Sequence, residues 1–375
     1  MSTAPQPPED TPLEERVLVA SQWRLIWWRF RKHRLAVAAG AVVLLLSLVA
    51  LFGDFLATGS PRASNAVRRH LPPQGIHWFD EGRWRPHVYA IRSRVDPDTL
   101  QRIHEPDPTD KIPVRFFAKG EPYRLLGLIP TRRRLLGVEG HPTRTHIYIL
   151  GTDKLGRDLW SRLMYGTRIS MSVGLLGVLV SLVLGVTLGG ISGYYGGWVD
   201  TVIQRVIEFL LGIPTIPLWM GLAAALPKDW SILRIYFAVT IIISLIAWTG
   251  MARVVRGKFL ALREEDFVTS ARLAGCSEMR IIFRHMVPAM TSHIIAATTL
   301  AIPSMIVSET ALSFLGLGLR PPAISWGVLL QEAQTVQSVA LYPWLMIPAL
   351  AVILAVLAFN FFGDGLRDAA DPYGG

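Results

Sequence analysis

Cysteine and charged side chains are both scarce in this chain. Its 375 residues include one cysteine, Cys276, so no disulfide can form within the chain. Charged residues make up 18% of the sequence, whereas soluble domains carry about 25%. Hydrophobic residues make up 51%, and the mean hydropathy is +0.37. The composition therefore predicts an integral membrane protein.

Motifs that would support catalysis are also missing. No G-x-x-x-x-G-K-[ST] phosphate loop occurs, so we expect ATP hydrolysis to take place on another chain and no cofactor to bind here. Six histidines show no H-E-x-x-H or similar metal-binding spacing; they are His70, His77, His87, His104, His141 and His146. A membrane-embedded enzyme therefore stays a remote alternative, and a channel lacks a selectivity-filter pattern. The net charge is +10, but no signature of nucleic-acid binding accompanies it.

The first fifty residues predict a cytoplasmic start and one membrane span. Residues 1–20 are acidic and proline-rich without an apolar core, so we expect a disordered tail and no cleavable signal peptide. In residues 21–53, tryptophans and arginines precede an apolar run from Leu35 to Phe52. This order favours a helix in the headgroup layer followed by a transmembrane helix. By the positive-inside rule, the basic residues keep the N-terminus in the cytoplasm.

A long polar segment, residues 54–168, follows this first span. We expect it to form a small extracytoplasmic domain that leads into the core, with short strands at Pro113–Phe117 and His146–Leu150. Its many arginines make it basic. That charge suits a docking surface for an acidic partner, although an ordinary solvated face explains it as well.

Residues 169–363 predict a membrane core with five further spans. We place the spans at Ile169–Ile191, 202–226, Ile232–Met251, Met290–Leu312 and Leu341–Phe362. Pro214 and Pro217 should kink the span at 202–226. Small residues recur every fourth position in the span at 169–191 and just beyond it, which favours close helix packing; they are Gly177, Ser181, Gly185, Gly189 and Gly193.

The last two spans are joined by a broken segment. Residues 312–334 contain several glycines and prolines, so we expect a partly re-entrant external segment. Trp326 and Trp344 are expected to lie at the membrane interface. Residues 364–375 should form a second cytoplasmic tail.

Two acidic residues within the predicted spans are candidates for the transport pathway. Glu208 follows Arg205 by three residues, so it suits either a pathway acid or a structural ion pair. Glu309 follows Pro288 by 21 residues. At ~1.5 Å per helical residue, this spacing places Glu309 at the outer end of its span. There it would either line a cavity or lie at the membrane interface.

Residues 264–288 form a basic, helix-forming stretch between two apolar runs. At helical spacing its apolar positions are Phe267, Ala271, Ala274, Met279, Ile282 and Phe283. Gly275 and Ser277 interrupt the pattern, which predicts two short helices at an angle. Pro288 suits the first turn of the next helix. A bulky residue at Gly275 should disturb the segment, whereas alanine should be tolerated if the backbone dihedral is ordinary.

This stretch resembles the Glu-Ala-Ala signature of ABC-importer permease subunits, the cytoplasmic loop that docks onto the ATPase. Thr269, Ser270 and Ala271 stand at the Glu-Ala-Ala positions, and Gly275 and Pro288 match at the family's spacing. The resemblance assigns ATPase coupling to this set of residues: Thr269, Ser270, Ala271, Gly275, Arg284, His285 and Pro288. Thr269 replaces the family's Glu and His285 replaces its Ile, which leaves the role of the missing carboxylate open.

A second likeness lies at the entry to the core. Residues 150–158 are similar to the L-G-T-D-x-x-G-R-D motif at the start of the core in the dipeptide/oligopeptide permease subfamily. The matching residues are Leu150, Gly151, Thr152, Asp153, Gly156, Arg157 and Asp158. The likeness continues to the C-terminus, while residues 54–149 carry little of it.

The resemblance implies an all-α type I importer permease of about six transmembrane helices with a cytoplasmic coupling helix, plus a small extracytoplasmic insertion domain. It implies a C-type subunit in a bacterial inner membrane with both termini in the cytoplasm. The implied partners are a second permease subunit in a heterodimer, two ATP-binding subunits that hold ATP and Mg, and an extracytoplasmic solute-binding protein. Peptides are the implied cargo of alternating access, with oligosaccharides, opines or metal chelates as alternatives.

Overall fold

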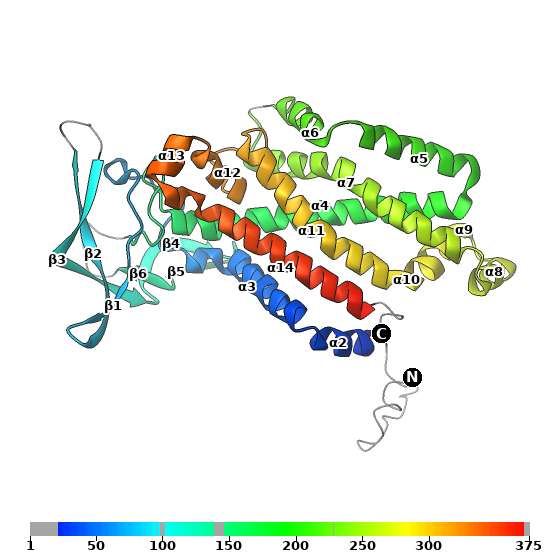
Figure 1. Ribbon diagram of the computed structural model, residues 1–375, viewed down its shortest axis with the longest axis horizontal. Helices are drawn as coiled ribbons and strands as arrows, with labels where there is room; N and C mark the ends of the chain where they lie inside the picture. The colour runs from blue at the N-terminus through cyan, green and yellow to red at the C-terminus, as the bar shows by residue number, and fades with distance from the viewer. Residues whose placement is uncertain (1–21, 96, 98–101, 139–145, 228, 371–375) are drawn as a thin grey trace, which may run out of the picture.

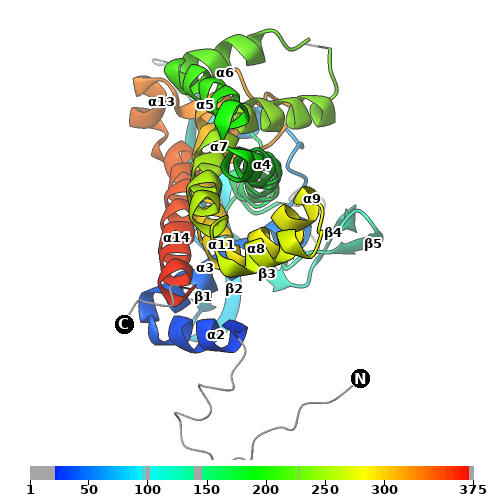
Figure 2. The same cartoon turned by 90° about the vertical axis from the view of Figure 1, so that its right-hand side faces the viewer.

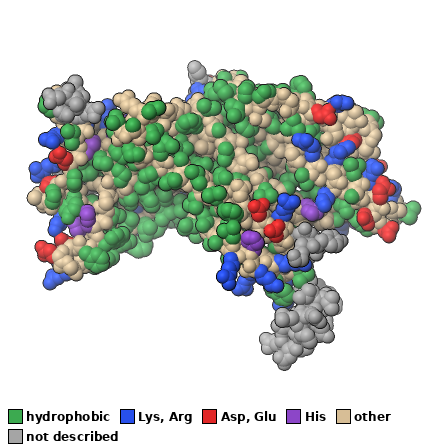
Figure 3. Space-filling view, viewed as in Figure 1, with side chains coloured by type: hydrophobic (Ala, Val, Ile, Leu, Met, Phe, Trp, Pro, Cys, Tyr) green, Lys and Arg blue, Asp and Glu red, His purple; other side chains and the backbone are tan. Residues whose placement is uncertain are grey.

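The computed structural model describes residues 22–95, 97, 102–138, 146–227 and 229–370. Its long helices lie side by side along the longest axis of the molecule (Figure 1). The β-strands gather at one end of this helical body, and the short helices α8 (Asp266–Leu273) and α9 (Glu278–Arg280) lie at the other. Charged side chains gather towards the two ends, whereas hydrophobic side chains cover much of the surface between them (Figure 3). This distribution suits a helical bundle embedded in a bilayer.

Within the described residues, five helices are long and apolar enough to cross a membrane. They are α3 (Arg34–Leu56), α4 (Leu159–Tyr195), α7 (Ile232–Leu262), α11 (Thr291–Phe314) and α14 (Ile347–Ala370). A sixth span is obtained only if the bent pair α5 (Gly197–Gly212) and α6 (Thr215–Ala224) crosses the membrane as one. The expected helical core of about six spans is therefore present as five or six.

The bend between α5 and α6 measures 86°. It falls at Ile213 and Pro214, and Pro214 is the N-cap residue of α6. A proline has no N–H for the helical ladder and clashes with the preceding turn, so α5 must stop before it. The expected kink is confirmed, and its size makes this region a broken span or a re-entrant pair.

Two helices are longer than the apolar runs that predicted them. α4 begins at Leu159 rather than Ile169, and α7 continues to Leu262 rather than ending at Met251. The 37 residues of α4 give a rod of about 55 Å, which exceeds a hydrocarbon core of about 30 Å. Polar side chains at the ends of both helices are satisfied by tertiary contacts, so the helices continue where hydropathy ends. α14 likewise runs to Ala370, through most of the residues expected as a tail.

The small residues of α4 form its contact with α7. A Cβ atom at Gly189 would lie 2.4 Å from the carbonyl oxygen of Ala252, and one at Gly193 would lie 2.5 Å from Cβ of Phe259. These distances are too short for any side chain, so only glycine allows the two backbones to approach this closely. The expected close packing is confirmed.

Residues between α3 and α4 form a β-rich segment. One sheet has the strand order β1–β2–β3–β6, and a separate hairpin consists of β4 and β5. The strands are β1 (His77–Asp80), β2 (Arg83–Val95), β3 (Arg102–Phe116), β4 (Lys119–Leu125), β5 (Ile129–Arg133) and β6 (Leu136–Val138). The strand expected at Pro113–Phe117 is the end of β3. The strand expected at His146–Leu150 is wrong, because these residues form a loop in which the N–H of Tyr148 donates to the Gln74 side chain and its carbonyl oxygen accepts from the N–H groups of Gln74 and Gly151.

The segment that precedes α14 is buried instead of interfacial. α12 (Trp326–Leu330) packs against α4 and α11, and Trp326 is 0% exposed. Its backbone N–H donates to Ser170 Oγ over 3.0 Å, so the prediction that Trp326 lies at the membrane interface is wrong. Trp344 is half-buried, and its indole N–H donates to the carbonyl oxygen of Thr152 over 3.0 Å. These tertiary hydrogen bonds hold both tryptophans in position.

Candidate coupling site and pathway residues

The coupling segment consists of two short helical arms, as expected. α8 is the first arm, and the second runs through α9, the π-helical turn η2 (Ile281–Met286) and α10 (Val287–Ala289). Pro288 lies in the first turn of α10, where its missing N–H leaves no partner unsatisfied. Figure 1 places the two arms at the end of the molecule opposite the β-strands.

Gly275 closes the first arm with a left-handed backbone, φ +73°. The N–H of Cys276 bonds to the carbonyl oxygen of Ala271 over 3.1 Å, and that of Gly275 bonds to Arg272 over 3.0 Å. This pair of bonds is a Schellman motif, in which glycine is favoured because it alone adopts this conformation without strain. A Cβ atom at Gly275 would meet nothing within 4 Å. The backbone dihedral, and not lack of space, therefore sets the requirement for glycine.

One face of the two arms is packed against the ends of α4 and α7. Val268, Ile281, Ile282 and Met286 are fully buried in a cluster with Phe259. Of the apolar positions expected from the sequence, Ala271 and Ile282 are buried, whereas Phe267, Ala274, Met279 and Phe283 are exposed. The buried cluster makes the two arms and the long helices one packed body, so a displacement of the arms reaches the spans directly.

The opposite face of the arms exposes apolar and basic side chains together. Leu273 is 86% exposed at the end of α8. Its exposed neighbours are Phe267, Met279 and Phe283 with the cations Arg272, Arg280 and Arg284. Large apolar side chains ringed by charge are typical of a protein interface. Thr269, Ser270 and Pro288 are also exposed, and His285 is half-buried, so the residues assigned to coupling divide between this face and its edge.

An ion pair joins three helices next to the coupling segment. Arg256 on α7 donates to both carboxylate oxygens of Asp200 on α5, over 2.6 and 2.5 Å. Ser192 at the end of α4 donates to the same carboxylate. Sequence reasoning missed this triad, because Arg256 lies 56 residues beyond Asp200 and the three residues carry no motif.

The first pathway candidate is a surface residue in this chain. Glu208 is 61% exposed and accepts a bond from Arg205 over 2.8 Å. The two residues lie on successive turns of α5, which supports the reading as a local ion pair.

Glu309, the second pathway candidate, is 0% exposed. Ser170 of α4 donates to one carboxylate oxygen over 3.1 Å, and Ser313 donates to the other over 2.8 Å. Glu309 therefore lies inside the protein in this chain, and its role as a pathway residue stays a prediction. The hydroxyl groups that allow its burial are on helices that meet only in the fold.

An apolar cavity of about 490 Å³ opens between α4, α6, α7 and α11. Its lining includes Ser181, Trp219, Met251, Ser304 and Ser308. Neither Glu208 nor Glu309 is among the lining residues. The polar groups that this cavity offers to a solute are hydroxyls and an indole rather than carboxylates.

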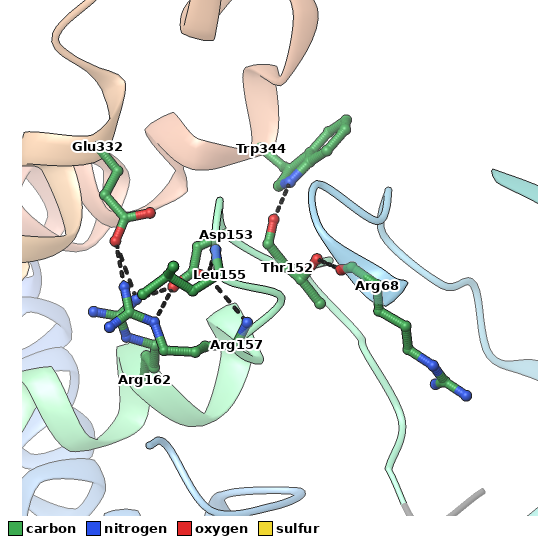
Figure 4. Close-up of polar contacts among 8 residues, drawn as sticks. All are labelled: Arg68, Thr152, Asp153, Leu155, Arg157, Arg162, Glu332 and Trp344. Atoms are coloured by element: carbon green, nitrogen blue, oxygen red, sulfur yellow. Dashed lines mark hydrogen bonds and ion pairs between the residues drawn. The ribbon is translucent and has the colours of Figure 1, made fainter. Parts of the chain in front are cut away.

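The sequence string from Leu150 to Asp158 forms a polar clamp at the other end of the bundle (Figure 4). Asp153 accepts from Arg157 Nε over 2.6 Å and also from Arg162. Both arginines reach Glu332 after α12, at 2.6 and 3.3 Å. The clamp fixes the start of α4 to the segment before α14. The motif pointed to Asp153 and Arg157, but nothing in the sequence indicated Arg162 or Glu332.

Asp158 ends the motif as the N-cap of α4. Its carboxylate accepts from the backbone N–H of Ser161 over 2.9 Å and from Thr58 Oγ1 over 2.7 Å. The N-cap satisfies a helix N–H that has no partner within the helix, and Thr58 ties the cap to the end of α3. This motif is therefore structural in the present fold.

Two partly buried histidines, His70 and His146, lie in the β-rich segment, outside the spans. Burial lowers the pKa of His146 from its usual value, with Glu121 and Asp158 opposing the shift. Burial also lowers the pKa of His70, whose ring stacks on Tyr342 at 3.8 Å between centroids. Within the described residues no group of three or more His, Cys, Asp or Glu side chains could hold a metal ion.

The five long apolar helices and the bent pair α5–α6 define a multi-span membrane protein. The family model for the binding-protein-dependent transport system inner membrane component matches residues 185–373. A second model, the N-terminal TM domain of oligopeptide transport permease C, matches residues 21–73. This chain therefore belongs to the family of binding-protein-dependent transport system inner membrane components.

Curated relatives agree over most of the chain. The glutathione transport system permease protein GsiD of Pectobacterium atrosepticum is 32% identical, covering 94% of this chain and 92% of that protein. The dipeptide transport system permease protein DppC of Bacillus subtilis is 30% identical, covering 92% and 84%. The oligopeptide transport system permease protein OppC of the same organism is 36% identical, covering 64% and 75%. A solved structure of the MetNI methionine ABC transporter covers 57% of this chain at 16% identity and a TM-score of 0.43, which is too distant to support a conclusion.

Proposed function

We propose that this chain forms half of the membrane pathway of an ATP-driven importer for peptides or solutes of similar size. The observation that carries the proposal is that the arms expose the large apolar side chains of Leu273 in α8 and Phe283 in η2 at the end of the bundle opposite the β-strands. An ATPase subunit that binds this face would move the arms, and the buried cluster around Phe259 would pass the movement to α4 and α7. Repeated tilting of these helices would expose the pathway to each side in turn.

The orientation of the chain follows from charge. Helix α2 (Gln22–Lys32), which contains Arg24, Arg29, Arg31 and Lys32, lies in the half of the molecule that also contains the coupling arms (Figure 1). The positive-inside rule places that end, and both termini, in the cytoplasm of a bacterial cell, with the bundle in the inner membrane. Residues 54–168 then face outward.

The partners proposed are those that the transport cycle requires. Two ATP-binding subunits would supply ATP and Mg, a second permease subunit would complete a heterodimer, and an extracytoplasmic solute-binding protein would deliver the cargo. The names of the relatives, which refer to glutathione, dipeptides and oligopeptides, support a peptide cargo. Oligosaccharides, opines and metal chelates are the alternatives within the same class.

Two measurements test the proposal. Affinity purification of the chain should bring down ATP-binding subunits, and the reconstituted complex should take up a radiolabelled peptide in the presence of ATP. A Leu273→Asp variant, which places a carboxylate on the docking face, should lose the ATP-binding subunits; Phe79→Asp, at an exposed position on β1 remote from that face, should retain them. Loss in both variants, or in neither, would count against the docking face.

Orientation is tested separately by cysteine labelling. In a Cys276→Ser background, a cysteine at Ser64 should react with an impermeant maleimide added outside intact cells, whereas one at Ser277 should react only after permeabilisation. Reaction of both positions from outside would contradict the proposed topology.

A further inference from the structure

The β4–β5 hairpin extends from the base of the β-rich segment. The N–H of Phe117 bonds to the carbonyl oxygen of Leu135, and that of Arg134 bonds to Ala118, both over 3.0 Å, which joins the hairpin base to β3 and β6. Beyond this base, β4 and β5 pair with each other as a ladder of two strands. A hairpin of two strands is marginally stable in water, because it has too little surface to bury. Its conformation must therefore be held by contacts at its base or by a surface on which it rests.

The base of the hairpin is fixed to the outer end of the span α3. The N–H of Leu135 donates to the carbonyl oxygen of Phe55 over 2.8 Å. The buried guanidinium of Arg134 donates to the carbonyl oxygens of Ala57 and Gly59, over 3.2 and 3.1 Å. Since α3 ends at Leu56, these bonds hold the base where that span leaves the hydrocarbon.

The hairpin extends sideways from this point. In the view along the long axis, β4 and β5 project beyond the outline of the helices (Figure 2). The seven residues of β4 reach about 20 Å from the base at ~3.3 Å per residue. A projection that starts at the membrane boundary and runs laterally stays near the bilayer surface.

The tip of the hairpin is unusually apolar for an exposed turn. Leu126, Leu128 and Ile129 are 41%, 81% and 57% exposed. Leu126 also has a positive φ of 55°, a conformation that asparagine or glycine adopts with less strain. A leucine that is both strained and exposed contributes nothing to folding in water, which points to a ligand-binding role for the tip.

The charges around the tip are of one sign. Residues 122–134 contain four arginines and no acidic residue. Arg124, Arg132 and Arg133 are exposed beside the apolar tip, while Arg134 is the buried residue at the base. Leucines flanked by arginines fit the boundary between acyl chains and phosphate headgroups, where each group meets its preferred surroundings.

We propose that the β4–β5 hairpin is a membrane-binding element whose leucine tip enters the headgroup–acyl boundary of the bilayer and whose exposed arginines bind lipid phosphates. The occupant is phospholipid, because the hairpin base is continuous with the membrane boundary at α3 and the charges nearest the tip, Arg124, Arg132 and Arg133, are positive, with the single acid Glu121 farther along β4. The element holds the β-rich segment against the membrane beside the bundle. The assignment to the outer leaflet rests on the proposed orientation, but insertion itself does not.

Fluorescence quenching in nanodiscs tests the insertion, since both leaflets are accessible there. In a Cys276→Ser background, an environment-sensitive dye is attached to a cysteine introduced by Leu128→Cys, and the chain is studied in complex with its partner subunits. The matched control is Phe79→Cys, an apolar residue that is 67% exposed on β1, in the separate sheet. The quenchers are a nitroxide on the lipid chain just below the headgroup and aqueous iodide.

The dye at position 128 should be quenched by the lipid nitroxide about threefold more than the dye at position 79, and by iodide correspondingly less. Arg132→Gln combined with Arg133→Gln should reduce the lipid quenching in discs that contain anionic lipid. Equal iodide quenching at both positions would overturn the proposal, because the tip would be in water. Protection from both quenchers would overturn it in favour of a contact with a partner subunit. Neither result would affect ATPase docking at the opposite end of the bundle, so this proposal fails independently of the proposed function.

Discussion

Arg256 and Asp200 form a two-bond ion pair that joins α7 to α5 at the coupling end of the bundle, with distances of 2.6 and 2.5 Å. Ser192 connects the same carboxylate to α4. The pair lies one helical turn from Phe259, around which the coupling arms pack. Movement of the arms is thus tied to three helices through one carboxylate.

The first prediction concerns this pair. Arg256→Lys keeps the charge but loses the planar two-bond geometry, so it should cost about 1–2 kcal/mol of stability. Transport should fall more than ATP hydrolysis, because the arms would move without carrying α5 with them. Uptake and ATPase rates measured on one reconstituted preparation decide this. Lys258→Arg is the control on the same helix, and equal losses in the two variants would contradict a specific role for the pair.

The second prediction concerns Gly275. Its φ of +73° means that alanine is strained as well as leucine, because the ordinary dihedral on which tolerance of alanine depended is not present. Gly275→Ala and Gly275→Leu should each cost about 1 kcal/mol or slightly more, whereas Gly275→Asn should cost less. Substrate-stimulated ATP hydrolysis should follow the order Gly, Asn, then Ala and Leu together. Full uptake with leucine at this position would remove the turn from the coupling mechanism.

A substitution at Thr269, on the same arm as Gly275, tests the first position of the resembled signature. Thr269→Glu restores the residue of the resembled signature at an exposed position in the first turns of α8. A negative charge near a helix N-terminus is favourable. Association with the ATP-binding subunits should be unchanged or slightly tighter, as measured by retention during purification. A loss of association would show that the acidic position has been replaced by a different contact in this chain.

The third prediction concerns Glu309. Glu309→Gln keeps the size and an acceptor for Ser313, so thermal stability and uptake should be close to those of the parent. Glu309→Ala leaves a cavity and the hydroxyls of Ser170 and Ser313 without their acceptor, and should cost about 2–4 kcal/mol. Uptake that fails with glutamine at unchanged stability would instead make the carboxylate part of the pathway.

The fourth prediction concerns pH. Burial lowers the folded-state pKa values of His146 and His70 below the ordinary 6.5. The unfolded chain then binds more protons than the folded chain at acidic pH, so stability is fully present above about pH 6.5 and decreases as the pH falls below it. The apparent melting temperature should drop between pH 6.5 and 5, and His146→Gln, which does not titrate, should reduce that drop. An unchanged slope in this variant would contradict the assignment to His146.

The apolar runs and charged flanks of the sequence determined the approximate position of five spans, while the 86° bend between α5 and α6 makes a sixth span depend on whether this pair crosses the membrane as one. The kink at Pro214 and the turn at Gly275 were also readable, because proline and glycine act on the local backbone whatever surrounds them. The small residues at every fourth position of α4 also predicted a close helix contact, although the sequence did not identify the partner helix.

Only the tertiary structure decided which polar groups are buried and where the long helices end. The start of α4 at Leu159 depends on a cap, Asp158, that is held by Thr58 from 100 residues earlier. Glu309 is buried because Ser170, on another helix, supplies a hydroxyl to its carboxylate. Burial of a polar group is stable only when partners surround it, and the partners here come together from distant parts of the chain. Hydropathy depends on each side chain and not on the residues that surround it in the fold. It therefore located the spans but could not predict these tertiary contacts.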